Sequence, residues 1–303
     1  MAETVSLAQM VKPKHHQPRL PMLRRITTIL FEPKVAVPAS FLFLLLLVAI
    51  LAPFLAPHNP LDQDLMLSAL PPAGAEGAEQ GYWLGTDNLG RDVLSRLIFG
   101  TRVALIVAVL AAGLAALIGT TLGLLAGWYR GPVDATISRL VEIWMSFPPV
   151  LLSILLVAVI GSGVVSVIAA IAIIDWTRFC RVIRAETMAQ AQQDYVLAAR
   201  AVGYPRHRIL LREILPNLVP ILLALVSLEM GIAVIVEAIL SFVGLSVSSD
   251  TPTWGGMIAE GRQYIHQTWW VLVAPLAALF ATVLSFNQLG EGLRRALDPV
   301  LRR

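Results

Sequence analysis

The chain has 303 residues, of which 57% are hydrophobic and only 14% are charged. Ordinary soluble domains carry about 25% charged residues, so this composition indicates an integral membrane protein. The formal net charge of +3 does not indicate a nucleic-acid partner, because the basic residues divide by membrane side, as shown below.

Several kinds of chemistry are excluded by the scarcity of particular residues. All three lysines, Lys12, Lys14 and Lys34, precede the first apolar segment, so no later position can supply the lysine of a P-loop. The single cysteine, Cys180, excludes an internal disulfide and a multi-cysteine metal site. No histidine pairs with a carboxylate at metal-ligand spacing. We therefore expect no metal, no cofactor and no catalytic residue in this chain.

Six segments meet or approach the roughly 20 apolar residues that a helix needs to cross a bilayer. They are residues 35–56, 103–128, 137–161, 164–180, 221–245 and 269–289. The third is the least regular, because Arg139 and Glu142 lie in its first part, which we interpret as the inner end of the span. The first is longer than a signal-peptide core and is interpreted as an uncleaved anchor. The sequence thus predicts an all-α membrane protein with six transmembrane helices.

The orientation follows from the basic residues. With the N-terminus in the cytoplasm, 19 of the 23 Lys and Arg residues lie on the inner side, which satisfies the positive-inside rule. Both termini are then cytoplasmic. The predicted organisation is a basic tail (1–34), a first transmembrane helix (35–56), an external loop (57–102), a five-helix core (103–290) with a cytoplasmic loop at 181–216, and a second tail (291–303).

Within the external loop, residues 87–100 are predicted to form an interfacial helix that leads into the second span. Asp87 stands where a helix cap is expected, and apolar positions such as Val93 and Leu97 alternate with the charged Arg91 and Arg96. The order of acidic residues does not fit a calcium-binding loop. Packing at the membrane interface is therefore the favoured interpretation.

The cytoplasmic loop contains the segment DYVLAARAVG at 194–203. Tyr195, Ala198, Ala199 and Val202 fall at i, i+3, i+4 and i+7 and form one narrow apolar stripe, with no apolar partner expected within the loop itself. Gly203 follows where a helix C-cap favours positive φ.

The residues after Gly203 predict how the loop ends. Pro205 can open a second short helix, and Pro216 and Pro220 mark where the fifth span is expected to begin. An amphipathic loop whose arginines serve only membrane orientation would show the same periodicity.

The spacing of Ala198 and Ala199, then Gly203, then Leu215 and Pro216 resembles the EAA loop of permease subunits in ATP-binding-cassette (ABC) importers. Leu197 and Glu213 depart from the usual motif. In that family this loop is the coupling helix that docks into the ATPase subunit. The resemblance implies that the coupling residues are Tyr195, Ala198, Ala199, Arg200, Val202, Gly203, Leu215 and Pro216.

Five further blocks resemble the dipeptide, oligopeptide and nickel permease family, and most closely its second permease subunit. They are residues 85–105, 127–148, 241–246, 252–257 and 286–299. The resemblance implies the MetI-like fold of type I ABC importers, in the bacterial cytoplasmic membrane. It also implies a homologous permease partner, two ATPase subunits that bind ATP and Mg, and an external solute-binding protein. Trp254 and Gly255 would belong to an external loop, in which Thr253 replaces the glutamate often found in the family. This substitution leaves open whether the loop contacts the binding protein or the solute.

Glu229 and Glu237 lie in the fifth predicted span, about 80° apart around the helix. Carboxyl groups at membrane depth face protein or a water-filled cavity. They could line the solute pathway, or they could tie helices or subunits together. Asp175 stands three residues before Arg178, which predicts a local ion pair.

Two other functions are alternatives to an ABC permease subunit. The first is a self-sufficient proton-coupled transporter that uses Glu229 and Glu237, which the lack of visible repeats disfavours. The second is an intramembrane enzyme, which the lack of a nucleophile with its base disfavours.

Overall fold

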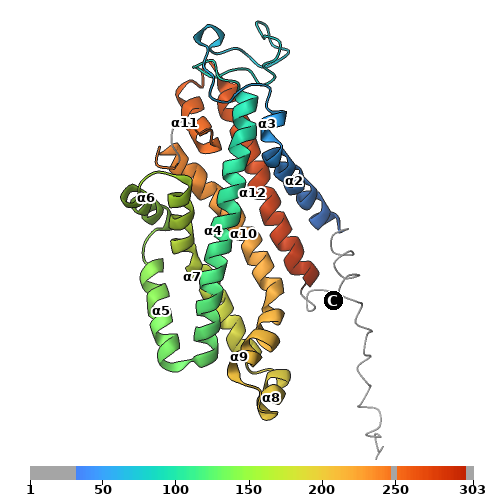
Figure 1. Ribbon diagram of the computed structural model, residues 1–303, viewed down its shortest axis with the longest axis vertical. Coiled ribbons are helices and arrows are strands. Elements are labelled where there is room, and N and C mark those ends of the chain that lie inside the picture. The colour runs from blue at the N-terminus through green and yellow to red at the C-terminus, as the bar shows by residue number, and fades with distance from the viewer. Residues whose placement is uncertain (1–31, 247–250, 298–303) are drawn as a thin grey trace, which may run out of the picture.

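The computed structural model describes residues 32–246 and 251–297, and both ends of the chain beyond these ranges, including most of the basic N-terminal tail, lie outside the described part (Figure 1). The helices are α2 (Pro33–Ile50), α3 (Ala52–Leu55), α4 (Val93–Tyr129), α5 (Gly131–Met145), α6 (Pro149–Ile160), α7 (Val164–Gln190), α8 (Asp194–Ala201), α9 (Arg206–Arg208), α10 (Leu215–Phe242), α11 (Trp254–Gln263) and α12 (Trp269–Leu297). A 3₁₀ turn covers Leu65–Leu67, and a π-helical segment, Ile209–Ile214, joins α9 to α10. The prediction of an all-α protein is confirmed.

Four helices in the described ranges are long and apolar enough to cross a membrane, and the count is five if the bent pair α5 and α6 forms one broken span. The four are α2, α4, α12 and the helix that runs from Arg206 to Phe242. The third predicted span is divided, because α5 and α6 meet at an angle of 87°. The fourth corresponds to α7, which carries Asp175 and Arg178 within its length. The count of six spans stays a prediction.

The two ends of the bundle carry different connecting segments. The loop between α3 and α4 gathers at one end, and α8 and α9 gather at the other (Figure 1). α4 runs the length of the bundle between them, as the predicted alternation of outer and inner loops requires.

The predicted interfacial helix at 87–100 is wrong in its boundaries. The helix begins at Val93 and continues without a break into the second span as α4. Its N-cap is Asp92, whose side chain accepts a hydrogen bond from the Ser95 amide, and Asp87 lies in the preceding loop. A helix that lies on the membrane surface and a helix that enters the membrane have the same local periodicity. The sequence pattern therefore cannot distinguish between the two.

α4 packs against α7 through glycines spaced four residues apart. A Cβ added at Gly123 would lie 2.8 Å from the Cys180 carbonyl oxygen, and one at Gly127 would lie 2.7 Å from that of Arg184. Membrane helices use such small residues to bring backbones close together. The contact fixes α7, and therefore the loop that follows it, against the central helix.

We expect Gly123→Leu to lower the half-unfolding temperature of the purified protein, because the added side chain must force the α4 and α7 backbones apart. Overpacking of this kind costs about 1–3 kcal/mol or more. The matched control is Gly113→Leu on the same helix, since nothing lies within 4 Å of a Cβ there. Equal melting temperatures for the two variants would contradict the close packing of α4 and α7.

Candidate functional site at the α8 end of the bundle

α8 has one face turned into its own chain. Val196 is fully buried and Ala199 is 9% exposed, and both belong to an apolar cluster with Ile183, Ile209 and Ile214. The expectation that the stripe has no apolar partner within its own loop is therefore wrong at Ala199. The helix is anchored by this inner face, so the surface it presents is shifted around the helix.

The outward surface of α8 carries Leu197, Ala198 and Val202, and we call these three residues the α8 apolar surface. All three are exposed, Val202 to 75%. The sequence predicts Ala198 and Val202 for the coupling contact, whereas Leu197 is a departure from the family motif. Exposed apolar side chains on a charged loop are typical of an interaction surface.

Tyr195 and Arg200 fasten α8 to neighbouring elements. The Tyr195 hydroxyl donates to Gln190 Oε1 at 2.6 Å and accepts from Asn217 Nδ2 at 3.3 Å. Partial burial raises the pKa of the Tyr195 phenol, and the Glu213 carboxylate acts in the same direction, so the hydroxyl remains a donor. The Arg200 guanidinium lies 4.4 Å from the centroid of the Trp128 ring, a cation–π contact with α4.

Gly203 ends α8 as predicted, with φ of +84°. The Tyr204 amide donates to the Ala199 carbonyl at 3.1 Å, and the Gly203 amide donates to the Arg200 carbonyl at 3.0 Å. These two bonds make a Schellman motif, which requires a residue with left-handed backbone at this position. The turn therefore sets the direction in which the α8 apolar surface points.

The chain after this turn rises directly into the bundle. Pro205 caps the short α9, and α9, the π-helical segment and α10 together form a helix of 37 residues from Arg206 to Phe242. The start of α10 at Leu215 agrees with the boundary predicted at Pro216, whereas Pro220 lies inside the helix. The chain does not break at this boundary, because α9 and the π-helical segment lead into α10. Leu215 packs partly buried against the apolar cluster, and Pro216 is exposed. Movement of α8 would thus be transmitted along a continuous helix.

Glu237 is 1% exposed and is satisfied within its own chain. Its carboxylate accepts from the Ser241 hydroxyl at 2.6 Å and from the Ser246 hydroxyl at 3.2 Å. The Ser246 carbonyl in turn accepts from the Gly163 amide at 2.6 Å. Glu237 therefore joins the end of α10 to the start of α7, which favours the packing role over the pathway role.

Glu229 lies in a different setting, close to the ion pair predicted from the sequence. Arg178 Nε lies 3.7 Å from Asp175 Oδ1, so that pair is confirmed. Arg178 Nη1 also lies 3.7 Å from Glu229 Oε2, which links α7 to α10. Glu229 and Glu237 do not share one site, because separate partners hold them.

The opposite end of the bundle is held by an ion cluster that the sequence pattern did not reveal. Asp87 Oδ2 accepts from Arg91 Nε at 2.7 Å and from Arg96 Nη1 at 2.5 Å. Both arginines also contact Glu260 of α11, at 2.8 Å and 2.6 Å. The cluster fixes the loop between α3 and α4 to the start of α4 and to α11. The sequence predicts this loop to be external, and we refer to it as the external loop.

Trp254 and Gly255 are buried beside this cluster. Trp254 Nε1 donates to the Leu97 carbonyl at 3.1 Å, and a Cβ at Gly255 would collide with the backbone of Ala238. Thr253 is the N-cap of α11, because its hydroxyl accepts from the Gly256 amide at 3.1 Å. These residues pack α11 onto α4 and α10, so they do not form an exposed external surface.

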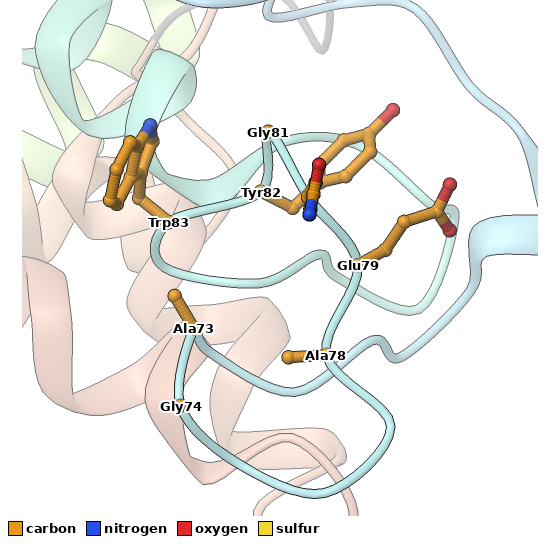
Figure 2. Close-up of a pocket in the computed structure, with 8 residues that line it drawn as sticks. Ala73, Gly74, Ala78, Glu79, Gly81, Tyr82 and Trp83 are labelled. Carbon is orange, nitrogen blue, oxygen red and sulfur yellow. The ribbon is translucent and has the colours of Figure 1, made fainter.

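The external loop also has a hollow of about 450 Å³ on its surface. It is lined by small side chains such as Ala73 and Ala78, together with Glu79, Tyr82 and Trp83 (Figure 2). The rings of Tyr82 and Trp83 point away from each other, so they do not converge on one ligand. Within residues 32–246 and 251–297, no group of three or more His, Cys, Asp or Glu side chains could hold a metal ion.

Comparison with known proteins identifies the family. Residues 119–303 match the family described as the binding-protein-dependent transport system inner membrane component, and residues 27–72 match the N-terminal transmembrane domain of oligopeptide transport permease C. The di/tripeptide transport system permease protein DppC of Pseudomonas aeruginosa is 38% identical over 87% of this chain and 88% of its own length. The glutathione transport system permease protein GsiD of Pectobacterium atrosepticum is 40% identical over 87% of each chain.

The fold also matches a solved structure. An inward-facing structure of the MetNI methionine ABC transporter aligns with a TM-score of 0.57 and 20% identity, over 68% of this chain and 97% of the other. At this identity the likeness establishes the fold alone, and it confirms the predicted MetI-like architecture. The chain therefore belongs to the family of binding-protein-dependent transport system inner membrane components, and it is a permease subunit of an ABC importer.

Proposed function

We propose that this permease forms one half of the membrane pathway of an ATP-driven importer for dipeptides or short oligopeptides. The observation that carries the substrate class is the identity of 35–41% with di/tripeptide, dipeptide and glutathione permease subunits over most of the chain. Its partners are a homologous permease, two ATPase subunits that hold ATP and Mg²⁺, and an external solute-binding protein. The chain itself catalyses no reaction.

The α8 apolar surface is the contact through which ATP hydrolysis drives this permease. Val196 and Ala199 anchor the inner face of α8, and the turn at Gly203 sets the direction of the helix. The side chains of Leu197, Ala198 and Val202 are exposed in the described part of the chain. Because α9 and α10 continue from the same turn, closure of the ATPases would move α10 and the helices packed against it. Alternating access then follows from rigid helices that pivot around a central path.

The proposed function is tested by reconstituting the permease with its partner subunits in proteoliposomes and measuring uptake of labelled dialanine. Uptake is expected only when ATP is present on the side of the membrane that carries the ATPase subunits and the binding protein is present on the other side. Uptake driven by a proton gradient without ATP would contradict the proposal and favour the proton-coupled alternative. ATP-driven uptake of a nickel complex but not of peptides would change the substrate class alone.

The orientation gives a second expected result. In a variant with Cys180→Ser, Ala73→Cys should react with an impermeant thiol reagent added outside spheroplasts, whereas His207→Cys should react only after the membrane is opened. Both positions are exposed, so burial cannot explain a difference. The reverse pattern would place α8 outside the cell and would contradict its coupling role.

A further inference from the structure

Arg178 is a charged side chain at membrane depth. On α4, the residues opposite this part of α7 are Gly119, whose added Cβ would touch Phe179, and Gly123, whose added Cβ would touch Cys180. Both glycines lie within the long apolar helix α4. Arg178 is therefore level with the apolar part of α4 and, through its contact with Glu229, with the interior of the fifth predicted span, whereas the count from the sequence places it among the 19 inner-side residues.

The two carboxyl groups beside Arg178 are buried, whereas the guanidinium is open. The side chains of Asp175 and Glu229 are only 6% and 4% exposed, while that of Arg178 is 42% exposed. Both nitrogen–oxygen distances are 3.7 Å, which is too long for a hydrogen bond, so the carboxyls hold the guanidinium in place without occupying its donors.

The opening at Arg178 has a structural cause in the bend between α5 and α6. α6 turns by 87° and packs on the outer half of α7, where Val157 joins the same apolar cluster as Val167. On the inner half, α5 covers α7 only in part, because a hollow of about 590 Å³ lies between the two helices and Arg181 Nη1 reaches Met145 Sδ at 3.4 Å. Arg178, Arg181 and Ala185, at i, i+3 and i+7, form a partly exposed line along it toward the α8 end.

An arginine that opens outward at this depth does not face lipid, because insertion of a charge there is costly. It faces a water-filled cavity or another protein chain. Arg181, one turn further toward the α8 end, lines the hollow between α5 and α7, which extends the polar surface that begins at Arg178 and favours a water-filled cavity. A guanidinium also presents a planar fork of donors that matches a carboxylate.

We propose that Arg178 lines the solute pathway and that its guanidinium binds the carboxylate of the solute as it moves inward, with Asp175 and Glu229 as positioning residues. This inference rests on the proposed function, since every peptide with a free C-terminus carries a carboxylate. It assigns a specific contact inside the membrane, separate from the selection made by an external binding protein.

The first test compares Arg178→Gln, Arg178→Lys and the control Arg139→Gln in reconstituted complexes with labelled dialanine as the probe. Arg139 is 80% exposed and pairs with Glu142 at the surface. Arg178→Gln should lower uptake at least about tenfold, as expected for loss of a charged hydrogen bond. It should retain assembly and the ATPase activity that the binding protein stimulates. Arg178→Lys should be intermediate, and Arg139→Gln should match the wild type. Normal uptake by Arg178→Gln would overturn the proposal.

The second test measures access to the same position and distinguishes a pathway from packing. In a Cys180→Ser background, the thiol introduced by Arg178→Cys should react with an anionic thiosulfonate reagent from the inner face, and trapping with ATP and vanadate should slow that reaction. An unreactive thiol in an assembled complex would mean that Arg178 only packs subunits together. If wild-type protein failed to transport dialanine, the proposed function would fail, yet this labelling would still decide whether Arg178 lines a water-filled pathway.

Discussion

Ala198→Asp should abolish ATP-driven uptake while leaving the permease inserted in the membrane. Ala198 lies between Leu197 and Val202 on the α8 apolar surface and is exposed in this chain. A carboxylate at the centre of a close-packed contact would be desolvated without a partner, which costs enough free energy to prevent docking. We expect the recovery of ATPase subunits with the tagged permease to fall at least about tenfold, the loss typical of a central interface residue.

Two further variants separate docking from folding. Ala198→Ser adds only a small neutral group and should retain most of the uptake. Ala199→Asp does not test docking, because Ala199 packs with Ile209 and Ile214 in its own chain, and a charge there would disrupt the loop itself. If Ala198→Asp kept normal ATPase association and hydrolysis stimulated by the binding protein, α8 would not be the coupling element.

The local geometry of α8 was predictable from the sequence because it depends on near neighbours. Gly203 follows the helical stripe at the place where a left-handed residue ends a helix, and it has the expected positive φ. The face that α8 buries was not predictable in the same way. Periodicity identifies an apolar stripe but not the partner that covers it. The sequence therefore assigns Ala199 to the contact with the ATPase subunit, although residues of its own chain cover it.

The division of the third predicted span shows a second limit. A hydropathy count measures apolar length regardless of direction, so residues 137–161 counted as one helix. The signal that was available is the pair Pro148 and Pro149, since proline lacks an amide hydrogen and restricts the residue before it. α6 begins at Pro149 after this break, at an angle of 87° to α5.

The ion cluster at the external end could not be found from spacing at all. Asp87 and Glu260 are more than 160 residues apart in the sequence, and both contact the same pair of arginines. The short-range pattern suggested a helix cap at Asp87, because an aspartate before an apolar run has that meaning in most proteins. Only the packing of α11 against α4 brings the four charges together.

Asp87→Ala should lower the stability of the permease more than any other single change in the external loop. Asp87 is fully buried and accepts four hydrogen bonds, from the Leu89 and Arg91 amides and from the Arg91 and Arg96 guanidinium groups. Removing it leaves two buried arginines with Glu260 as their shared partner. Breaking a buried charge network in this way costs about 3–5 kcal/mol. The measurement is the half-unfolding temperature of the purified permease complex.

The graded and control variants decide whether charge pairing is the cause of that loss. Asp87→Asn keeps an acceptor for the backbone amides but removes the negative charge, so its melting temperature should lie between those of the wild type and Asp87→Ala. Asp62→Ala, in the same loop, removes a carboxylate that is exposed and accepts from Asn59 Nδ2 at 2.8 Å, and it should change stability by less than about 1 kcal/mol. Equal effects of Asp87→Ala and Asp62→Ala would show that the external loop is not held by its ion cluster. A loss for Asp87→Asn as large as that for Asp87→Ala would instead assign the whole effect to charge, because the backbone bonds that Asn can replace would then contribute nothing measurable.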